Sequence, residues 1–319
     1  MEFKFVRTGW LGFYSDALRM LMSYMVCKKE GKPFTIDSRD WIFTHDKGWH
    51  DYFTTLEESP VYDTLPQINW DKSDDRQFTV AEYKNAMKEV FVYQPYFHEL
   101  ADKVSKELCL GSDYTAVFVR RGDKLLGESV YIPTEAYVQL ALSTGASTVF
   151  VQTDDYRVVD EIRSMIRVQR PDIRVVTTCP AEKHGHFVFA VETSEVRTMQ
   201  YQDQNGNKFI NNQNVEYLNA TRRQKPLMEF TKEEIKAHVE EMIVGMILCQ
   251  RSKNLVIDHT SNVGRYLHFT HPGGRSALRI IEDLEIRVSP TIRLLPYVSY
   301  KDEEYITNPR YHCVHNRYS

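Results

Sequence analysis

The sequence has few cysteines and no long apolar run. Its longest apolar stretch near the N-terminus is interrupted by Arg19 and preceded by Asp16, with no small-residue cleavage site after it. We therefore expect neither a signal peptide nor a membrane span, and a cytoplasmic protein. The five cysteines are far apart and form no CxxC pair, which argues against a zinc site or a disulfide framework; they are Cys27, Cys109, Cys179, Cys249 and Cys313.

The chain also lacks a basic excess. It has 40 Lys and Arg against 44 Asp and Glu, a formal net charge of -4. This balance argues against a nucleic-acid-binding surface, so any recognition of phosphate must come from a local site. Neither a GxxxxGK[ST] loop nor a Cys-based phosphate loop occurs, which argues against the kinases and phosphatases that use them.

The pattern of apolar residues predicts alternating strands and helices. The first part starts with a strand over 3–6, a helix capped by Ser15 or Asp16 and closed by Gly31, and a strand over 33–37. A helix over 80–106, interrupted near Pro95, ends this part, and we place a domain change near residue 108.

The second part continues the alternation as far as a polar insertion over 201–226. We expect strands over 114–119, 148–152, 173–177 and 254–258, and helices over 133–144, 156–167, 231–249 and from 260 onward. The helix at 231 starts with a capping box, Thr231 with Glu234. Such alternation predicts an α/β fold with a parallel sheet covered by helices on both faces.

Polar clusters follow three of these strands directly, at 120–124, 153–155 and 259–262. Ligands of parallel sheets bind beyond the carboxyl ends of the strands, so the clusters predict a binding site there.

The first cluster suits a diphosphate. Arg120 and Arg121 follow a buried strand, and guanidinium groups hold phosphate in a bidentate way. In the alternative interpretation the two arginines point to opposite sides of the sheet, and only one of them or neither meets a ligand. Glu128 lies nearby in sequence as a candidate general base, or it is simply a solvated loop charge.

The other two clusters have structural alternatives as well. Asp154 and Asp155 could bind a metal, although a cap for the following helix fits two adjacent carboxylates better. Ser261 at a helix start could donate its hydroxyl and backbone N–H to phosphate, or it could be a plain N-cap.

The residues 117–124, Val-Phe-Val-Arg-Arg-Gly-Asp-Lys, followed by Glu128, resemble the motif of the core (protein N-glycan) fucosyltransferases. Relatives of that family are the bacterial nodulation fucosyltransferases and, more distantly, the protein O-fucosyltransferases. Further blocks in the same order resemble the family over about two thirds of the chain, at 9–12, 36–41, 48–49, 93–96, 153–155 and 261–265.

The resemblance implies a GT-B-like fold, with two Rossmann-like α/β domains facing a central cleft. Residues 1–108 would form the acceptor side, 109–290 the domain that binds the nucleotide-sugar donor, and 291–319 a tail that packs back on the body. The implied reaction is an inverting, metal-independent transfer of a sugar, L-fucose from GDP-fucose, to a hydroxyl of a glycan acceptor, with no cofactor.

The resemblance also implies roles for single residues. Arg120 would hold the β-phosphate, Arg121 would support the site, Lys124 would assist a proton relay and Glu128 would deprotonate the acceptor hydroxyl. The remaining donor-binding residues would be Gly9, Gly12, Asp154, Asp155, Thr260, Ser261 and Asn262.

Two positions depart from the family pattern. Phe118 stands where the family usually has His, and Gly245 stands where the family has an aspartate that faces guanine. Asp258, Glu240 or Glu241 could replace that carboxylate. The alternatives are therefore a transferase that uses GDP-rhamnose or a UDP-sugar, and a non-catalytic relative that binds a nucleotide sugar. The stem and SH3-like parts of the animal enzymes are missing, which favours a microbial or viral enzyme.

Overall fold

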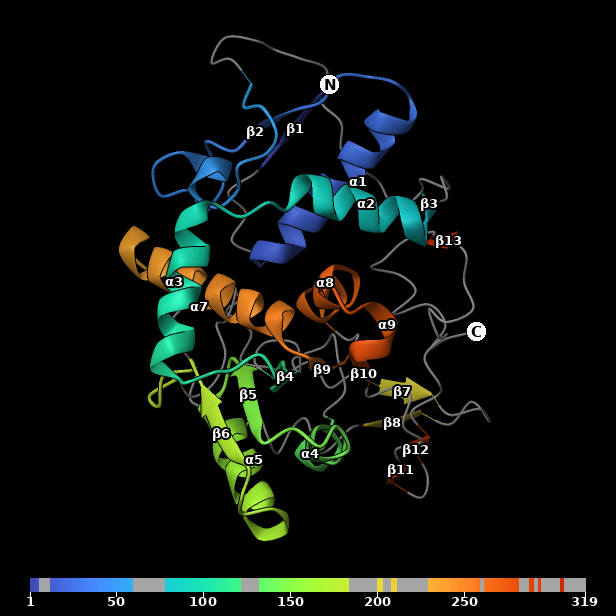
Figure 1. Ribbon diagram of the computed structural model, residues 1–319. Coiled ribbons are helices and arrows are strands. Elements are labelled where there is room, and N and C mark those ends of the chain that lie inside the picture. Colours follow the sequence, from blue (N-terminus) through green and yellow to red (C-terminus); the bar gives the residue numbers. More distant parts are fainter. Residues whose placement is uncertain are drawn as a thin grey trace.

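Strands and helices alternate through most of the chain, and the helices form layers on both sides of one sheet (Figure 1). The computed structural model describes residues 1–5, 12–59, 78–121, 132–183, 200–202, 208–210, 229–258, 261–280, 287–289, 292–293 and 305–306. Among these residues, no helix is both long and apolar enough to cross a membrane.

The first part begins with the predicted βαβ unit. Strands β1 (Glu2–Lys4) and β2 (Thr35–Asp37) pair in parallel and are joined by helix α1 (Phe13–Lys29). The predicted end is confirmed, because Gly31 follows the helix with a φ of 65°.

The predicted start of α1 is wrong. Gly12 is the N-cap, and its carbonyl accepts from the N–H groups of Ser15 and Asp16 at 2.8 and 3.1 Å. The helix starts earlier because Phe13 is buried among aromatic rings in the core, where an extra turn adds apolar contacts. Asp16 accepts a hydrogen bond from the indole of Trp41 at 3.2 Å rather than capping the helix.

Two helices lead to the sheet, and they are divided where the proline predicts. Helix α2 (Val80–Val90) starts with a capping box formed by Thr79 and Glu82, and α3 (Pro95–Glu107) has Pro95 in its first turn. Proline fits there because its missing N–H would have no partner inside the helix.

The central sheet has five parallel strands in the order β10-β9-β4-β5-β6. They are β4 (Thr115–Val119), β5 (Thr148–Thr153), β6 (Arg174–Thr177), β9 (Asn254–Ile257) and β10 (Leu278–Ile280). Helices α4 (Thr134–Leu142) and α5 (Tyr156–Gln169) cover one face, and α7 (Lys232–Arg251) and α8 (Asn262–Thr270) lie on the other side (Figure 1). The predicted α/β class with a parallel sheet is confirmed.

The remaining elements are short. They are η1 (Gly48–Asp51), β3 (Phe78–Thr79), α9 (Gly274–Ala277), β7 (Gln200–Gln202), β8 (Lys208–Ile210), β11 (Arg287–Ser289), β12 (Ile292–Arg293) and β13 (Tyr305–Ile306). Strands β7 and β8 pair antiparallel at one end of the predicted polar insertion. Strand β13 pairs with β3, so the tail lies on the first part of the chain at residues 305–306.

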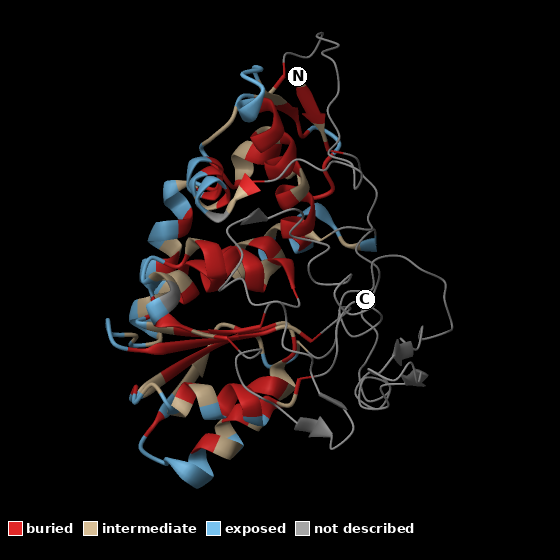
Figure 2. Ribbon diagram, turned by 90° about the vertical axis from the view of Figure 1, so that its right-hand side faces the viewer, coloured by how far each residue is buried: buried red, intermediate tan, exposed pale blue. Residues whose placement is uncertain are grey.

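The strands of the sheet are buried between the helices on its two sides (Figure 2). Their side chains alternate between two hydrophobic clusters, one on each face. In β4, Ala116 and Phe118 face α7, whereas Val117 and Val119 face α4 and α5. This period of two continues beyond the end of the strand and decides where the two arginines point.

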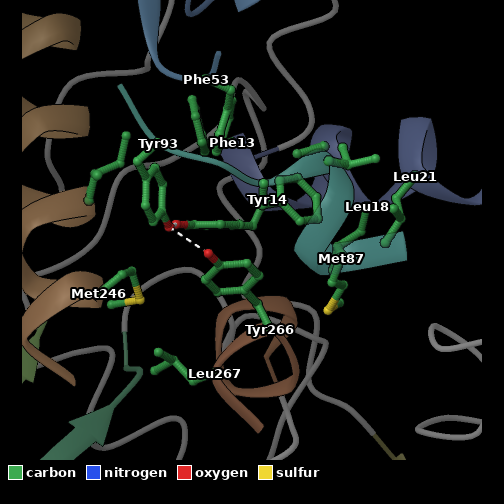
Figure 3. Packing of buried hydrophobic residues seen from close by; sticks show 14 of the residues in the cluster. Phe13, Tyr14, Leu18, Leu21, Phe53, Met87, Tyr93, Met246, Tyr266 and Leu267 are labelled. Atoms are coloured by element: carbon green, nitrogen blue, oxygen red, sulfur yellow. Dashed lines mark hydrogen bonds between the residues drawn. The ribbon is translucent and has the colours of Figure 1, made fainter. Parts of the chain in front are cut away.

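The cluster under α7 also contains the buried apolar side chains of the described residues between 1 and 107. At its centre, Tyr266 of α8 donates its hydroxyl hydrogen bond to Tyr93 at 2.8 Å, and Tyr93 is hydrogen-bonded to Tyr14 of α1 (Figure 3). One continuous core therefore joins the first part to the sheet across residue 108. The predicted domain boundaries stay a prediction.

Helix α7 packs closely on β5 at Gly245. A Cβ atom at this position would lie 2.1 Å from Oε1 of Gln152, a buried side chain that also accepts a hydrogen bond from Thr178 at 2.9 Å. The position that resembles a family aspartate therefore has no room for any side chain while Gln152 stays in place.

We predict that Gly245→Ala lowers the free energy of unfolding by about 1–3 kcal/mol, because the new methyl group overpacks the contact with Gln152. In a Gln152→Ala background the same change should be neutral or stabilising by up to about 1 kcal/mol, since alanine favours the helix. Urea unfolding of the four proteins measures both effects. An equal penalty in both backgrounds would contradict the contact.

Candidate functional site

The described residues of the three predicted polar clusters follow neighbouring strands at the carboxyl edge of the sheet. Strand β4 lies between β9 and β5, and Val119 is paired with Thr153 in register. Arg120 and Asp154 therefore leave the sheet side by side, and Ser261 follows the neighbouring strand β9. These residues therefore lie at the edge that the sequence predicts, and their role in binding stays a prediction.

Arg120 and Asp154 form an ion pair at this edge. Their side chains are 18% and 12% exposed, so the pair is partly open to solvent. Asp154 also accepts from the backbone N–H of Arg121 at 2.8 Å. One carboxylate thus orients the start of the segment that follows β4.

Arg121 points to the opposite face. It is only 1% exposed, donates to Oγ1 of Thr134 at 3.1 Å, and lies with its guanidinium 5.8 Å from the ring centre of Tyr137, both residues of α4. The structure therefore does not bring the two guanidinium groups together, and the alternative in which they diverge describes it better. Arg120 is the partly exposed member of the pair, whereas Arg121 is buried against α4, and a role of Arg121 at the site stays a prediction.

Asp155 caps helix α5, as predicted. Its carboxylate accepts from the N–H of Arg157 at 3.0 Å and pairs with the Arg157 guanidinium at 2.6 Å. The side chain has no exposed surface, so we expect any effect of Asp155 on a ligand to be indirect. In the part of the chain that the structure describes, no group of three or more His, Cys, Asp or Glu is arranged to hold a metal ion.

Ser261 caps helix α8 in the same way. Its Oγ accepts from the N–H of Gly264 at 3.0 Å, and the side chain of Asn262 accepts from Arg265 at 2.6 Å. A Cβ atom at Gly264 would lie 2.1 Å from the carbonyl oxygen of Asp258, so glycine lets the helix start directly beside the end of β9. The N-cap is confirmed, and contact of Ser261 with phosphate stays a prediction.

Four predicted site residues lie outside the described residues: Gly9, Lys124, Glu128 and Thr260. Gly12 is the N-cap of α1.

The proposed substitutes for the family aspartate lie in three different places. Asp258 is buried and accepts from the hydroxyl of Tyr137 at 2.8 Å, on the α4 face. Glu241 pairs with Lys183, and Glu240 lines a separate cavity beside α3. Of the three, Glu241 lies nearest to Gly245 along α7, because residues four apart share a face of a helix.

Two residues near Arg120 were not predicted from the sequence. Lys183 bonds the carboxylate of Glu241 at 2.8 and 3.0 Å. Burial lowers the pKa of His238 well below its usual value, and the positive charges of Lys183 and Arg120 lower it further. Burial also raises the pKa of Glu241, and Lys183 opposes that effect. Lys183 and Arg120, the two cations on the α7 face, thus both favour the neutral form of the His238 imidazole.

The sequence carries only a weak signal for this group. Residues 238 and 241 are three apart and share a face of a helix that the capping box predicts. Only the packing of α7 on the sheet shows that this face meets Arg120 and Lys183.

No protein-family model matches the chain, and no curated protein matches it. Among solved structures, the chain is similar to fucosyltransferase NodZ from Bradyrhizobium at 14% identity and a TM-score of 0.45, over 85% of this chain and 93% of that one. It is also similar to NodZ alpha-1,6-fucosyltransferase soaked with GDP-fucose, at 12% identity and a TM-score of 0.45, over 85% and 92%.

POFUT1 in complex with GDP is a third similar structure. The identity is 9% and the TM-score 0.48, over 88% of this chain and 98% of that one. At this level of similarity no residue role passes from these proteins to this chain.

We predict that His238 makes the fold sensitive to mild acid. A histidine of the unfolded chain titrates near pH 6.5, whereas His238 stays neutral in the folded protein. Below about pH 6.5 the unfolded state therefore binds the extra proton, and stability falls as the pH falls.

His238→Gln should lose less stability than the wild type between about pH 7.5 and 5, measured as the melting temperature at each pH. Burial also lowers the pKa of His271, but His271 is present in both proteins and its effect cancels. Parallel curves for the two proteins would contradict the assignment.

Proposed function

We propose that the chain is a glycosyltransferase that transfers L-fucose from GDP-fucose to a hydroxyl of a glycan. The observation that carries the proposal is the position of Arg120, partly exposed at the carboxyl edge of a parallel sheet, where α8 also starts after the neighbouring strand β9. This edge is where parallel sheets bind nucleotides, and a helix N-terminus favours phosphate.

Arg120 would bind the diphosphate of the donor. Its guanidinium pairs with Asp154, and phosphate oxygens can accept two parallel hydrogen bonds from a guanidinium and carry more negative charge. Arg121 would keep the strand end rigid through Thr134 and Tyr137 rather than touch the donor. Lys183 adds a second cation on the same face, held by Glu241.

The proposed chemistry is a single displacement. The acceptor oxygen attacks the anomeric carbon, the bond from that carbon to the diphosphate breaks, and the electron pair leaves with the diphosphate. The proton of the acceptor hydroxyl passes to the carboxylate of Glu128, with Lys124 assisting. The configuration at the anomeric carbon inverts, and Arg120 stabilises the charge that develops on the leaving group, as a metal would otherwise do.

The ordered motifs that resemble the fucosyltransferases support GDP-fucose as the donor. One observation favours an alternative: Gln152 fills the space beside Gly245, where the family has its carboxylate toward guanine. A transferase of the same chemistry that uses a UDP-sugar is therefore the second candidate.

Glu128→Gln should lower the rate of transfer by roughly 100-fold or more, while binding of the donor stays within a few-fold of the wild type. The substitution removes the base and leaves the phosphate contacts in place. Glu135→Gln, an exposed carboxylate at the start of α4, is the matched control and should be fully active. Addition of EDTA should leave the rate of transfer by the wild type unchanged, because Arg120 takes the place of a metal ion in the proposed reaction. An equal loss of binding and rate in Glu128→Gln would show that Glu128 is not the base.

Calorimetric titration with GDP and UDP tests the donor. GDP should bind more tightly, and Arg120→Ala should weaken binding of both nucleotides about tenfold to a hundredfold, since one charge-assisted contact contributes about 1.5–3 kcal/mol. Arg170→Ala, which removes an exposed arginine at the far end of α5, should change neither affinity. If UDP bound as tightly as GDP, the UDP-sugar alternative would replace GDP-fucose. If Arg120→Ala bound both normally, the phosphate site itself would be wrong.

A further inference from the structure

A cavity of about 590 Å³ lies between the first part of the chain and helix α7. Three segments that are distant in sequence form it: residues 45–52, the first turn of α3 and the first half of α7. Helices α3 and α7 pack against each other and lie below strands β1 and β2 in Figure 1. The volume falls within the range of about 300–1,000 Å³ that is usual for small-molecule sites.

The walls of the cavity are held in place by hydrogen bonds. The carboxylate of Asp51 accepts from the backbone N–H groups of His45, Asp46 and Lys47 at 2.8, 3.0 and 2.9 Å. Gln94, just before α3, donates from its side chain to the carbonyls of His50 and Phe53 at 2.9 and 3.1 Å. The segment over 45–52 is therefore attached to the start of α3 by hydrogen bonds, which fix the walls of the cavity.

The chemistry of the lining suits a sugar. Tyr96 has half of its surface exposed, an unusual state for a large aromatic side chain. The pKa of its hydroxyl is raised by burial and by the neighbouring carboxylate of Glu240. An aromatic ring of this kind can cover the apolar C–H face of a pyranose while its hydroxyl keeps a polar partner.

The charges around the ring come close to balance. Asp46, Asp51 and Glu240 oppose Lys47 and Lys236, which leaves no strong preference for an anion or a cation. Carboxylates and ammonium groups together accept from and donate to the hydroxyls of a neutral ligand. A neutral polyhydroxyl compound therefore fits better than a phosphate or a polyamine.

The cavity also lies close to the candidate site. Glu240 lines the cavity, and the next residue, Glu241, pairs with Lys183 on the face that meets Arg120. Consecutive residues of a helix point about 100° apart, so the two places lie on adjoining sides of α7, within about the 10–12 Å diameter of one helix. A bound oligosaccharide could span this distance.

We propose that the cavity binds a neutral sugar unit of the acceptor oligosaccharide, at a distance from the hydroxyl that reacts. This inference rests on the proposed transferase function, because that function supplies the oligosaccharide. It assigns recognition of the acceptor to Tyr96 and the polar groups around it.

The test is direct binding, measured by saturation-transfer NMR and calorimetry. The probes are neutral oligosaccharides of glucose, galactose and N-acetylglucosamine, two to six units long. The oligosaccharide that binds the wild type most tightly should bind Tyr96→Ala at least about tenfold more weakly. Tyr96→Phe keeps the ring, so its affinity should stay within about threefold of the wild type. Glu240→Gln should weaken binding as well, and GDP should bind all variants equally.

Val168→Ala is the control variant, since Val168 is also an exposed apolar side chain, 83% exposed, but lies on α5. It should bind the oligosaccharide normally. Wild-type affinity in Tyr96→Ala would overturn the proposal, and so would a protein that binds GDP but none of the oligosaccharides. If an oligosaccharide bound through Tyr96 and no nucleotide bound at all, the proposed nucleotide site at Arg120 would be wrong, whereas the sugar site at Tyr96 would be supported.

Discussion

The parallel register between β4 and β5 is the constraint on which the site depends. Because Val119 is paired with Thr153, Arg120 and Asp154 leave the sheet together and form an ion pair. A slip of one residue would send Arg120 to the opposite face, since side chains of a strand alternate with a period of two. The valines of both strands favour this register, because it buries them against α4 and α5 on one face of the sheet.

The two faces of the sheet edge have different roles. On the α4 face, Tyr137 donates its hydroxyl to Asp258 and lies beside the guanidinium of Arg121, so both buried charged groups have partners. Buried charges without partners are costly, and this arrangement avoids that cost. On the α7 face, Arg120 and Lys183 are only partly buried and remain able to exchange a carboxylate partner for a ligand.

The continuous core between the first part and the sheet fixes where the cavity beside Tyr96 lies relative to Arg120. Tyr14, Tyr93 and Tyr266 meet from three distant segments, and their hydroxyls satisfy one another inside the core. Since Tyr93 precedes α3 by two residues, this contact also places the first turn of that helix, and with it Tyr96. The donor and acceptor sites that we propose would thus be joined by one core, which suits a direct displacement because the reacting atoms must be held at a short distance.

The sequence by itself determined the order of strands and helices, the proline break before α3, the capping box at Thr231 and the polar clusters after β4, β5 and β9. These features depend on local propensity, on capping and on apolar periodicity, which act over a few residues. The tertiary structure decided what depends on contacts between distant residues. It started α1 at Phe13 because that ring packs in the core, and it filled the space beside Gly245 with Gln152 from another strand. It also separated Arg120 from Arg121, because only the packing of α7 and α4 on opposite faces shows which of the two alternating side chains stays accessible to a ligand.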